Sequence, residues 1–388
     1  MSVSAILCGV LSHFHDDTHN ALREAIAGWV KAEIAPNAYA WEEANEFPRE
    51  LFRSAGRAGI TGIGYPEEYG GGGGDVFHHL IATEELVRGG SVGTAVGLGS
   101  HTIAVPPILR LGTEAQKRRW VPGVCRGEIV AALGITEPGA GSDVANIACK
   151  AVKEGEHYVV NGQKTFITSG AVADIVTLAV RTGPPGYAGI SLLVVETDTP
   201  GFTVGRKLDK MGWWASDTAE LHLEDCRVPV GNLLGAENAG FFGIMANFVD
   251  ERLMLAATCV AMMKVVIEET ERFIREREAF GRSIARFQVI RHRMADMCTR
   301  EAAARAFTAT VAARHHAGED VTGEVAMLKN HCTDSCMWVC DQAVQLHGGY
   351  GYMREYLVER YFRDARLFPI GGGTAEIMRE IIAKQRGW

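Results

Sequence analysis

The residues best suited to chemistry lie in short segments rich in glycine and hydroxyl groups. Thr136 to Asp143 (TEPGAGSD) combines small residues, hydroxyls and free backbone N–H groups. Such a loop can closely approach a flat polar ring or a phosphate. Phe166 to Gly170 (FITSG) ends a predicted strand with an aromatic ring and two hydroxyls. Taken alone, either segment could also be an ordinary turn or strand end.

Three junctions between predicted helices carry similar residues. Phe280-Gly281 separates two helices and is surrounded by polar side chains, namely Arg277, Arg282 and Gln288. Gln345 to Gly351 (QLHGGYG) and Gly371 to Glu376 (GGGTAE) are two further glycine-rich junctions. What these segments can do depends on the elements that position them.

The hydrophobic pattern divides the chain into helices, a β region and helices again. Up to about residue 128, apolar residues recur every three or four positions, as in Asn20 to Ile34, which predicts amphipathic helices. From Ile129 to about Leu234, short β runs lie between loops, and Tyr158 to Ile167 is typical of a strand, an Asn-Gly turn and a second strand. From Gly240 onward, three long amphipathic stretches and a shorter one after Gly373 predict a four-helix bundle. We therefore expect an N-terminal helical domain (1–128), a small antiparallel β domain (129–236) and a C-terminal bundle (237–388).

Composition and charge narrow the function classes. The 388 residues are 47% hydrophobic and 22% charged, which is normal for a packed protein and excludes wholesale disorder. Lys and Arg number 39 against 47 Asp and Glu, and a net charge of −8 lacks the basic field that nucleic-acid binding needs. No run approaches a membrane span. The apolar run Ala5 to Leu11 is short, has no basic residue before it and lacks a convincing cleavage site, so we expect an ordinary N-terminal segment. We expect a cytoplasmic and bacterial protein.

Several common motifs are absent or misplaced. Strands do not alternate with helices, no GxGxxG follows a strand, and no phosphate-binding GxxxxGK[ST] occurs. Gly89 to Gly93 fits the GxSxG pattern around Ser91, but it follows a predicted helix instead of a strand, which argues against a hydrolase.

A metal site is not expected. The nine cysteines include no CxxC pair. One group with helical spacing is predicted to be buried and apolar in character, namely Cys332, Cys336 and Cys340. A second group is expected to be a solvated helix start, namely His13, His15 and His19 with Asp16 and Asp17.

Seven segments together resemble the acyl-CoA dehydrogenase family, in its order and spacing and over nearly the whole chain. They are Pro66 to Gly70, Thr136 to Asp143, Asn161 to Thr168, Lys210 to Gly212, Phe280-Gly281, Gln345 to Gly351 and Gly373-Thr374. The resemblance implies a mainly helical protein with a small middle β domain, assembled as a homotetramer. It also implies that FAD lies between the β domain and the bundle, with a neighbouring subunit completing its site. The implied reaction turns an acyl-CoA into a trans-2-enoyl-CoA, and its electrons pass to an electron-transfer flavoprotein.

The resemblance further implies which residues hold FAD. Thr136 and Thr168 would hydrogen-bond the isoalloxazine, and Phe166, where many relatives carry Trp, would lie against its face. Residues near Arg277, Gln288 and Gln345 would hold the pyrophosphate and adenine end across the subunit interface, because Arg suits pyrophosphate. The implied cofactor contacts are Leu133, Thr136, Gly141, Ser142, Phe166, Thr168, Arg277, Phe280, Gln288, Gln345, Leu346, Gly348, Gly349, Thr374 and Glu376. Ser142 could instead meet the CoA thioester arm.

The catalytic base departs from the commoner family pattern. The family removes the α-proton with a carboxylate, and most members place that Glu at the position of Gly372. A minority branch, which includes long-chain and isovaleryl-type enzymes, places it on the first bundle helix, where this chain has Asp250-Glu251-Arg252. We expect Glu251 to be the base, with Asp250 as its rival, because adjacent helical residues point about 100° apart.

The resemblance gives neighbouring residues roles in substrate binding. Arg252 would position the substrate or pair with a carboxylate. The Gly372 N–H would bind the thioester carbonyl, with Gly373, Asp250 and Ser142 near the substrate. The missing side chain at Gly372 is expected to leave space for a long or branched acyl chain, including a terpenoid one. The alternatives are a flavin monooxygenase or oxidase on the same fold, and a non-catalytic acyl-CoA-binding protein if Glu251 were solvent-exposed.

Overall fold

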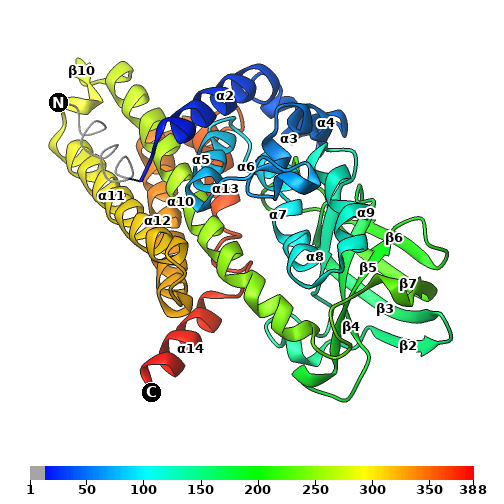
Figure 1. Ribbon diagram of the computed structural model, residues 1–388. Helices are drawn as coiled ribbons and strands as arrows, with labels where there is room; N and C mark the ends of the chain where they lie inside the picture. Colours follow the sequence, from blue (N-terminus) through cyan, green and yellow to red (C-terminus); the bar gives the residue numbers. More distant parts are fainter. Residues whose placement is uncertain (1–13) are drawn as a thin grey trace.

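Helices, a twisted sheet and a bundle of long helices follow one another along the computed structural model, which describes residues 14–388 (Figure 1). His13 and the run Ala5 to Leu11 lie outside the described residues. The N-terminal helices are α2 (Asp17–Glu33), α3 (Ala38–Ala44), α4 (Glu50–Arg57), α5 (Val76–Val87), α6 (Val92–Leu98), α7 (His101–Ala104), α8 (Pro106–Leu111) and α9 (Glu114–Cys125). Capping boxes at Asp16, Asp75 and Thr113 begin α2, α5 and α9, so local sequence fixes where these helices start.

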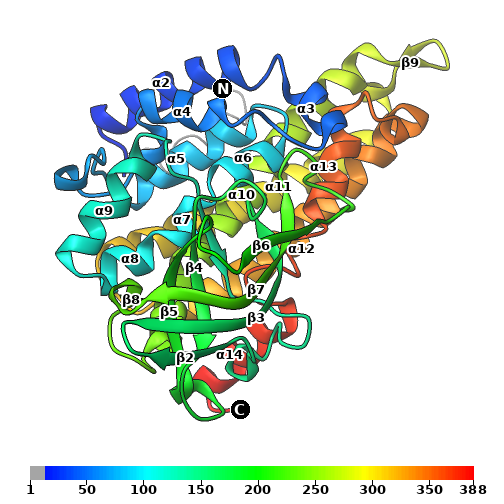
Figure 2. The ribbon, with the colours of Figure 1, turned by 90° about the vertical axis from the view of Figure 1, so that its right-hand side faces the viewer.

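The middle region is an eight-stranded sheet. Its strands are β1 (Ala131–Gly134), β2 (Lys150–Glu154), β3 (His157–Thr168), β4 (Ile175–Arg181), β5 (Ile190–Glu196), β6 (Phe202–Lys207), β7 (Thr218–Pro229) and β8 (Leu233–Leu234). They lie in the order β6-β7-β3-β2-β4-β5-β8, and β1 pairs with β4. Most contacts are antiparallel, but β1 runs parallel to β4, and β2 meets β4 in parallel through one residue pair. In Figure 2, which is turned by 90° from Figure 1, the strands of this sheet lie toward the viewer.

The predicted turn at Asn161-Gly162 is wrong. Both residues lie inside the continuous strand β3, and the connection between β2 and β3 is made instead at Gly155, whose φ is 59°. Gly162 serves a close approach, because a Cβ there would lie 2.6 Å from the Cα of Cys149. The Asn-Gly pair, which is typical of a hairpin turn, therefore lies inside a strand in this protein.

The C-terminal region is built on long helices. They are α10 (Gly240–Glu276), α11 (Gln288–His316), α12 (Thr322–His347), α13 (Leu357–Ala365) and α14 (Ala375–Arg386), with a hairpin of β9 (Glu278–Ala279) and β10 (Arg282–Ser283) between the first two. Helix α12 packs against each of the other four, and α10 also packs against α5. The bundle helices are confirmed, whereas α13 was not predicted. Figure 1 shows α10 running across the molecule from the sheet to the β9–β10 hairpin.

The core contains the cysteines that were expected to be buried. Cys332, Cys336 and Cys340 are fully buried on α12, which confirms that they pack as small apolar residues. No single helix among residues 14–388 is long and apolar enough to cross a bilayer. One bent pair, Val92–Leu98 with His101–Leu111, passes that test jointly by length and composition.

Candidate functional site

A buried ion pair fastens the loop that follows β1. Glu137 accepts hydrogen bonds from the Lys164 ammonium of β3 at 2.7 Å and from the backbone N–H groups of Ala148 and Cys149 at 2.6 and 3.0 Å. The N–H of Thr165 donates to the carbonyl of Thr136 at 2.9 Å. The start of the Thr136 to Asp143 loop is therefore held against the end of β3, so Thr136 lies beside the Phe166 to Thr168 segment.

Phe166 presents its ring to solvent from a distorted point of β3. Its φ is +60°, a costly conformation for an aromatic residue, and 67% of the residue is exposed. The pairing of β3 with β7 shifts register between Lys164 and Ile167, which is where the backbone turns the ring outward. Next to it, Thr136 and Thr168 are half-buried. An exposed aromatic face beside two half-buried hydroxyls is the surface that a flat heteroaromatic ring with polar edges would cover.

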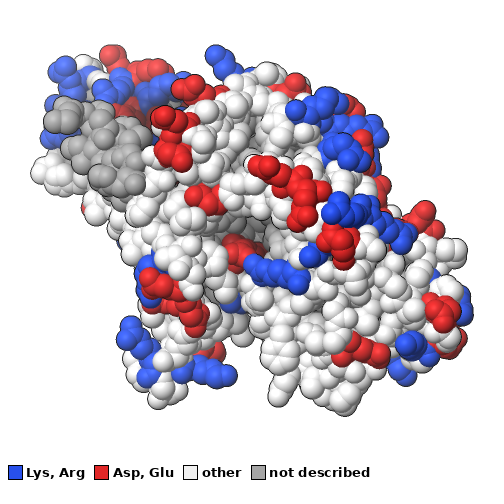
Figure 3. Space-filling view, in the orientation of Figure 1, with Lys and Arg blue, Asp and Glu red and all other residues white. Residues whose placement is uncertain are grey.

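The two carboxylates of the Asp250-Glu251-Arg252 triplet have different surroundings. Asp250 is ion-paired with Arg110 of α8 and lies 2.7 Å from His315 Nε2 of α11, and these partners hold its pKa below the usual value against the opposing effect of burial. Figure 3 shows the surface of the molecule in the orientation of Figure 1. A hollow opens near the middle of the face that is seen, with acidic and basic side chains beside it.

Glu251 is the carboxylate without a partner. Its Oε2 atom is buried and has no hydrogen-bond partner among the described residues. Burial raises the pKa of Glu251 to about 7, although the nearby charges of Arg252 and Lys329 act in the opposite direction. A buried carboxylate that is half-ionised near neutral pH is suited to proton transfer.

The glycine junction before α14 lies directly beside Glu251. A Cβ built on Gly372 would lie 3.4 Å from Glu251 Oε1, and φ is +63° at Gly372 and +92° at Gly373. Arg252 Nε donates to the carbonyl of Gly372 at 3.0 Å, so this side chain holds the loop. The ammonium of Lys329 donates to the carbonyl of Gly371 at 2.6 Å and also to that of Gly373.

The space expected at Gly372 is not open. A Cβ there would lie 2.5 Å from Leu255 Cδ1, so the position is already filled by Leu255 and by the Glu251 carboxylate. The missing side chain at Gly372 therefore does not make room for a longer acyl group, because Leu255 of α10 occupies the gap.

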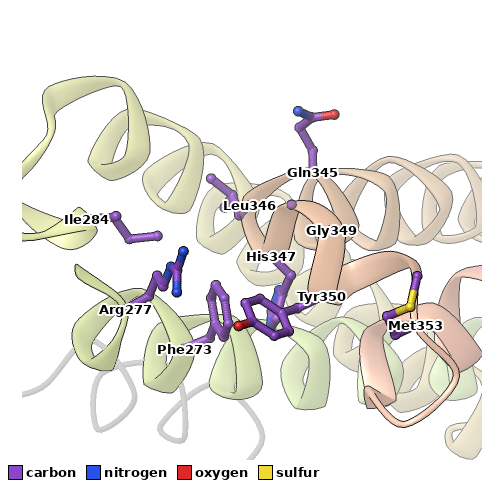
Figure 4. Close-up of a pocket in the computed structure, with 10 residues that line it drawn as sticks. Phe273, Arg277, Ile284, Gln345, Leu346, His347, Gly349, Tyr350 and Met353 are labelled. Atoms are coloured by element: carbon purple, nitrogen blue, oxygen red, sulfur yellow. The ribbon is translucent and has the colours of Figure 1, made fainter. Parts of the chain in front are cut away.

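A third set of predicted residues lines a cavity of about 490 Å³ at the far end of α10. Figure 4 shows Phe273 of α10 and Arg277, directly after that helix, facing His347 and Tyr350, whereas the amide of Gln345 points away from them. The predicted residues along this cavity are Arg277, Gln345, Leu346, Gly348 and Gly349. The other two predicted residues nearby do not line it: Phe280 is 95% exposed at the hairpin tip, and Gln288 is exposed at the start of α11.

This cavity is remote from Glu251 in the single chain. Arg277, the residue directly after α10, follows Glu251 by 26 positions in the sequence. At a rise of 1.5 Å per residue, this corresponds to about 39 Å along the axis. The two residues cannot hold the same flavin ring within one chain.

The remaining predicted residues lie around these centres. Leu133 is half-buried in β1, while Gly141 and Ser142 are exposed in the loop that follows it. Thr374 caps α14 by accepting a hydrogen bond from the N–H of Ile377 at 3.3 Å, and Glu376 is exposed on that helix.

Lys329 is the residue near the site that sequence reasoning missed. A signal was present, because Lys329 falls between Val325, Leu328 and Cys332 on the predicted apolar stripe of α12. A lysine on a buried face needs an acceptor, and the glycine junction provides it.

Two motifs outside this region have structural roles. Ser91 is fully buried, caps α6 and donates to Glu42 at 2.5 Å, so it is not a nucleophile elbow. The expectation of a solvated helix start is wrong at His19, which is buried between the helix-capping carboxylates of Asp16 and Asp75, at 2.8 and 3.1 Å. The ligand atoms of His19, Asp75 and His78 lie within 4.8 Å of one another, a grouping with α5 that the sequence did not indicate.

Family models match the whole described architecture. The N-terminal, middle and C-terminal domains of acyl-CoA dehydrogenase match residues 16–128, 132–226 and 238–386. The long-chain specific acyl-CoA dehydrogenase of Sus scrofa mitochondria is 38% identical over 370 residues, which cover 95% of this chain and 86% of that protein. The isovaleryl-CoA dehydrogenase of Pongo abelii mitochondria is 37% identical, with coverage of 94% and 87%.

Solved structures agree with these matches. A probable acyl-CoA dehydrogenase from Mycobacterium abscessus is 48% identical with a TM-score of 0.94, covering 96% of this chain and 99% of that one. The butyryl-CoA dehydrogenase from Megasphaera elsdenii is 33% identical with a TM-score of 0.93, covering 96% and 99%. Fold and matches together define a flavin-dependent oxidoreductase.

The chain belongs to the acyl-CoA dehydrogenase family. It dehydrogenates acyl-CoA, and its cofactor is FAD, as in the rest of the family.

Proposed function

We propose that this enzyme oxidises long-chain or branched acyl-CoA thioesters to trans-2-enoyl-CoA, with Glu251 as the base that removes the α-proton. The observation that carries the proposal is the unpartnered Glu251 carboxylate beside Gly372, with a pKa raised to about 7. The neighbouring carboxylate of Asp250 is already engaged by Arg110 and His315, and its pKa is lowered. Only Glu251 is both free to accept a proton and buried enough to be a useful base near neutral pH.

The residues around Glu251 suit the rest of the reaction. The N–H of Gly372 would donate to the thioester oxygen, where negative charge develops as the α-proton leaves. Arg252 and Lys329 hold the carbonyls of this loop and so keep the N–H groups available. Bound FAD supplies the acceptor for the hydride that leaves the β-carbon.

The residues of the β domain fit a bound flavin. Exposed Phe166, held at positive φ, would lie against the ring, and the hydroxyls of Thr136 and Thr168 would bind its polar edges. Ser142, exposed after β1, would meet the flavin phosphates or the thioester arm.

A second copy of the chain would complete the cofactor site. The cavity lined by Arg277, Gln345 and Gly349 lies at the opposite end of α10 from Glu251, so it would serve the cofactor of a neighbouring subunit. We therefore propose a homo-oligomer, a tetramer by family resemblance. We also propose an electron-transfer flavoprotein as the acceptor and the cytoplasm as the compartment.

The names of two relatives support the substrate class. A long-chain and an isovaleryl-CoA enzyme are each at least 37% identical to this chain. Because the gap at Gly372 is filled, the preference for long or branched chains rests on these relatives and on the placement of the base.

An anaerobic titration with straight-chain and branched acyl-CoAs tests the proposal by the loss of flavin absorbance. We expect bleaching by at least one long-chain or branched substrate, and its loss in Glu251→Gln. Glu268→Gln is the matched control, because Glu268 lies on the same helix and only pairs with Arg88 at the surface. Bleaching that survives in Glu251→Gln but disappears in Asp250→Asn would reverse the assignment of the base. Rapid reoxidation of the bleached flavin when oxygen is admitted after the titration would favour an oxidase.

A further inference from the structure

Lys329 is a buried cation that serves a backbone loop. Lys329 is fully buried on α12, and its ammonium donates to the carbonyls of Gly371 and Gly373. Among residues 14–388, its ammonium hydrogen-bonds only to these two backbone carbonyls. Burying an ammonium without a carboxylate is costly, so its contacts with the glycine junction stabilise a charge that the core would otherwise disfavour.

Two peptide units of this junction, Gly371–Gly372 and Gly372–Gly373, each have a carbonyl that accepts from a cation and an N–H that is free among residues 14–388. The carbonyl of Gly371 accepts from Lys329, whereas the N–H of Gly372 in that peptide unit has no acceptor among the described residues. The next unit repeats the pattern, because the carbonyl of Gly372 accepts from Arg252 and the N–H of Gly373 is unpaired among the same residues. Each peptide thus receives a cation at its oxygen and keeps its donor available.

A cation at a carbonyl oxygen makes the N–H of the same peptide a better donor. Hydrogen bonds in a chain polarise one another, and the effect is larger where water is excluded. Charge-assisted hydrogen bonds are also stronger than neutral ones. The charge of the Lys329 ammonium can therefore strengthen, by polarising one peptide unit, the hydrogen bond from the Gly372 N–H to the oxygen that it binds.

We propose that Lys329 is a positioning residue that polarises the Gly371–Gly372 peptide and thereby strengthens the hydrogen bond from the Gly372 N–H to the thioester oxygen. This inference rests on the proposed function, since it takes the Gly372 N–H as the thioester donor. Lys329 acts without touching the substrate, and it also fixes the loop through the carbonyl of Gly373. An arginine at Lys329 would keep the charge but not the single-point contact with two carbonyls.

The charge of Lys329 is itself sensitive to pH. Burial and, to a smaller extent, the charge of Arg252 lower the pKa of Lys329 to about 8, while Cys259 and Glu251 oppose the shift. These three groups, all on α10, are the titratable and charged neighbours that bear on it. The ammonium is therefore largely protonated at pH 7 and loses its proton as the pH rises through about 8.

Infrared spectroscopy of a bound product tests the inference without requiring catalysis. The carbonyl stretch of a ¹³C-labelled trans-2-enoyl-CoA is recorded on the oxidised FAD enzyme, where no proton abstraction is needed. A polarised carbonyl absorbs at lower frequency, so we expect a downshift on binding to the unmutated enzyme. We expect Lys329→Met to lose at least half of that shift and to reduce flavin bleaching by about tenfold, less than the loss of a direct donor.

Further variants separate charge from folding. Lys329→Gln keeps an amide donor for one carbonyl without the charge, and we expect an intermediate downshift. Lys384→Met, which removes an exposed lysine of α14, is the control and should behave as the unmutated enzyme. If neither Lys329 variant retains FAD, the downshift is followed in Glu251→Gln, which removes the ionisation of Glu251 over the same range. There the downshift should fall between about pH 7 and about pH 9, as the Lys329 ammonium deprotonates.

The outcomes separate this inference from the proposed function. An unchanged downshift in Lys329→Met, or one that is constant across that pH range, would overturn the role of Lys329. Continued bleaching by Glu251→Gln would overturn the base assignment and leave the carbonyl measurement standing. The absence of any downshift in the unmutated enzyme would reject Gly372 as the donor, and the role of Lys329 with it.

Discussion

The raised pKa of Glu251 predicts how the rate and the stability of this enzyme depend on pH. The pKa lies at about 7 against an ordinary value of 4.5. At 1.36 kcal/mol per unit, this difference corresponds to about 3 kcal/mol disfavouring the ionised carboxylate in the folded protein. Its cause is burial, which outweighs the attraction of Arg252 and Lys329.

The rate of proton abstraction should follow the ionised fraction of Glu251. With a pKa of about 7, roughly a tenth of the carboxylate is ionised at pH 6 and roughly nine-tenths at pH 8. We therefore expect the second-order rate constant for anaerobic flavin bleaching, measured by stopped flow at low substrate, to rise about tenfold between these values. A midpoint near 4.5, or a rate independent of pH over this range, would refute the reasoning.

Stability should change in the opposite direction. A carboxyl whose pKa is raised on folding contributes stability that is fully present below pH 4.5 and is lost as the pH rises through about 7. Glu251→Gln lacks this loss, so we expect it to unfold at a similar urea concentration to the parent near pH 4.5. At pH 8 it should be more stable, by up to about 3 kcal/mol. Equal stabilities at pH 8 would show that the carboxylate is solvated in the folded enzyme.

Two further substitutions test the scaffold of the site. Gly372→Ala places a Cβ 2.5 Å from Leu255 Cδ1 at a φ of +63°, so we expect about 2–4 kcal/mol of destabilisation in urea unfolding and slower flavin bleaching. Gly139→Ala, where a Cβ meets open space, is the control, and equal costs at the two sites would contradict this account. Lys164→Met leaves the carboxylate of Glu137 buried without its partner, so we expect about 3–5 kcal/mol of destabilisation together with weaker FAD retention, measured by flavin absorbance after gel filtration. Lys150→Met, on the exposed face of β2, should change neither property, and a Lys164→Met protein that keeps its FAD would show that the pair does not position the loop.

Local patterns were sufficient for the helices and for most strands. The capping carboxylate of Asp75 and the three- and four-residue spacing of α2, α11 and α12 each reflect interactions within one turn of helix, so they are readable from sequence. The turn expected at Asn161-Gly162 is wrong because close approach to Cys149, the residue directly before β2, requires glycine there. Short helix α13 was missed because its amphipathic stretch is only nine residues long.

The candidate site was predictable residue by residue, but its geometry was not. Sequence motifs, with the family they resemble, pointed to Glu251, Gly372, Phe166 and Arg277. Only the structure shows that Asp250 is engaged by Arg110 and His315, which lie 140 and 65 positions away in the sequence. It also shows that Leu255 fills the space beside Gly372, so the substrate range cannot be inferred from that glycine.

By itself, the sequence determined the order of helices, strands and helices, the family resemblance and the residue types available for chemistry, because these depend on local spacing. The tertiary structure decided which of two adjacent carboxylates is left without a partner, and it brought the buried ammonium of Lys329 to the Gly371–Gly373 carbonyls. The physical reason is that burial and pairing set the charge of an ionisable group. Both arise from residues distant in the chain that meet only when the helices pack.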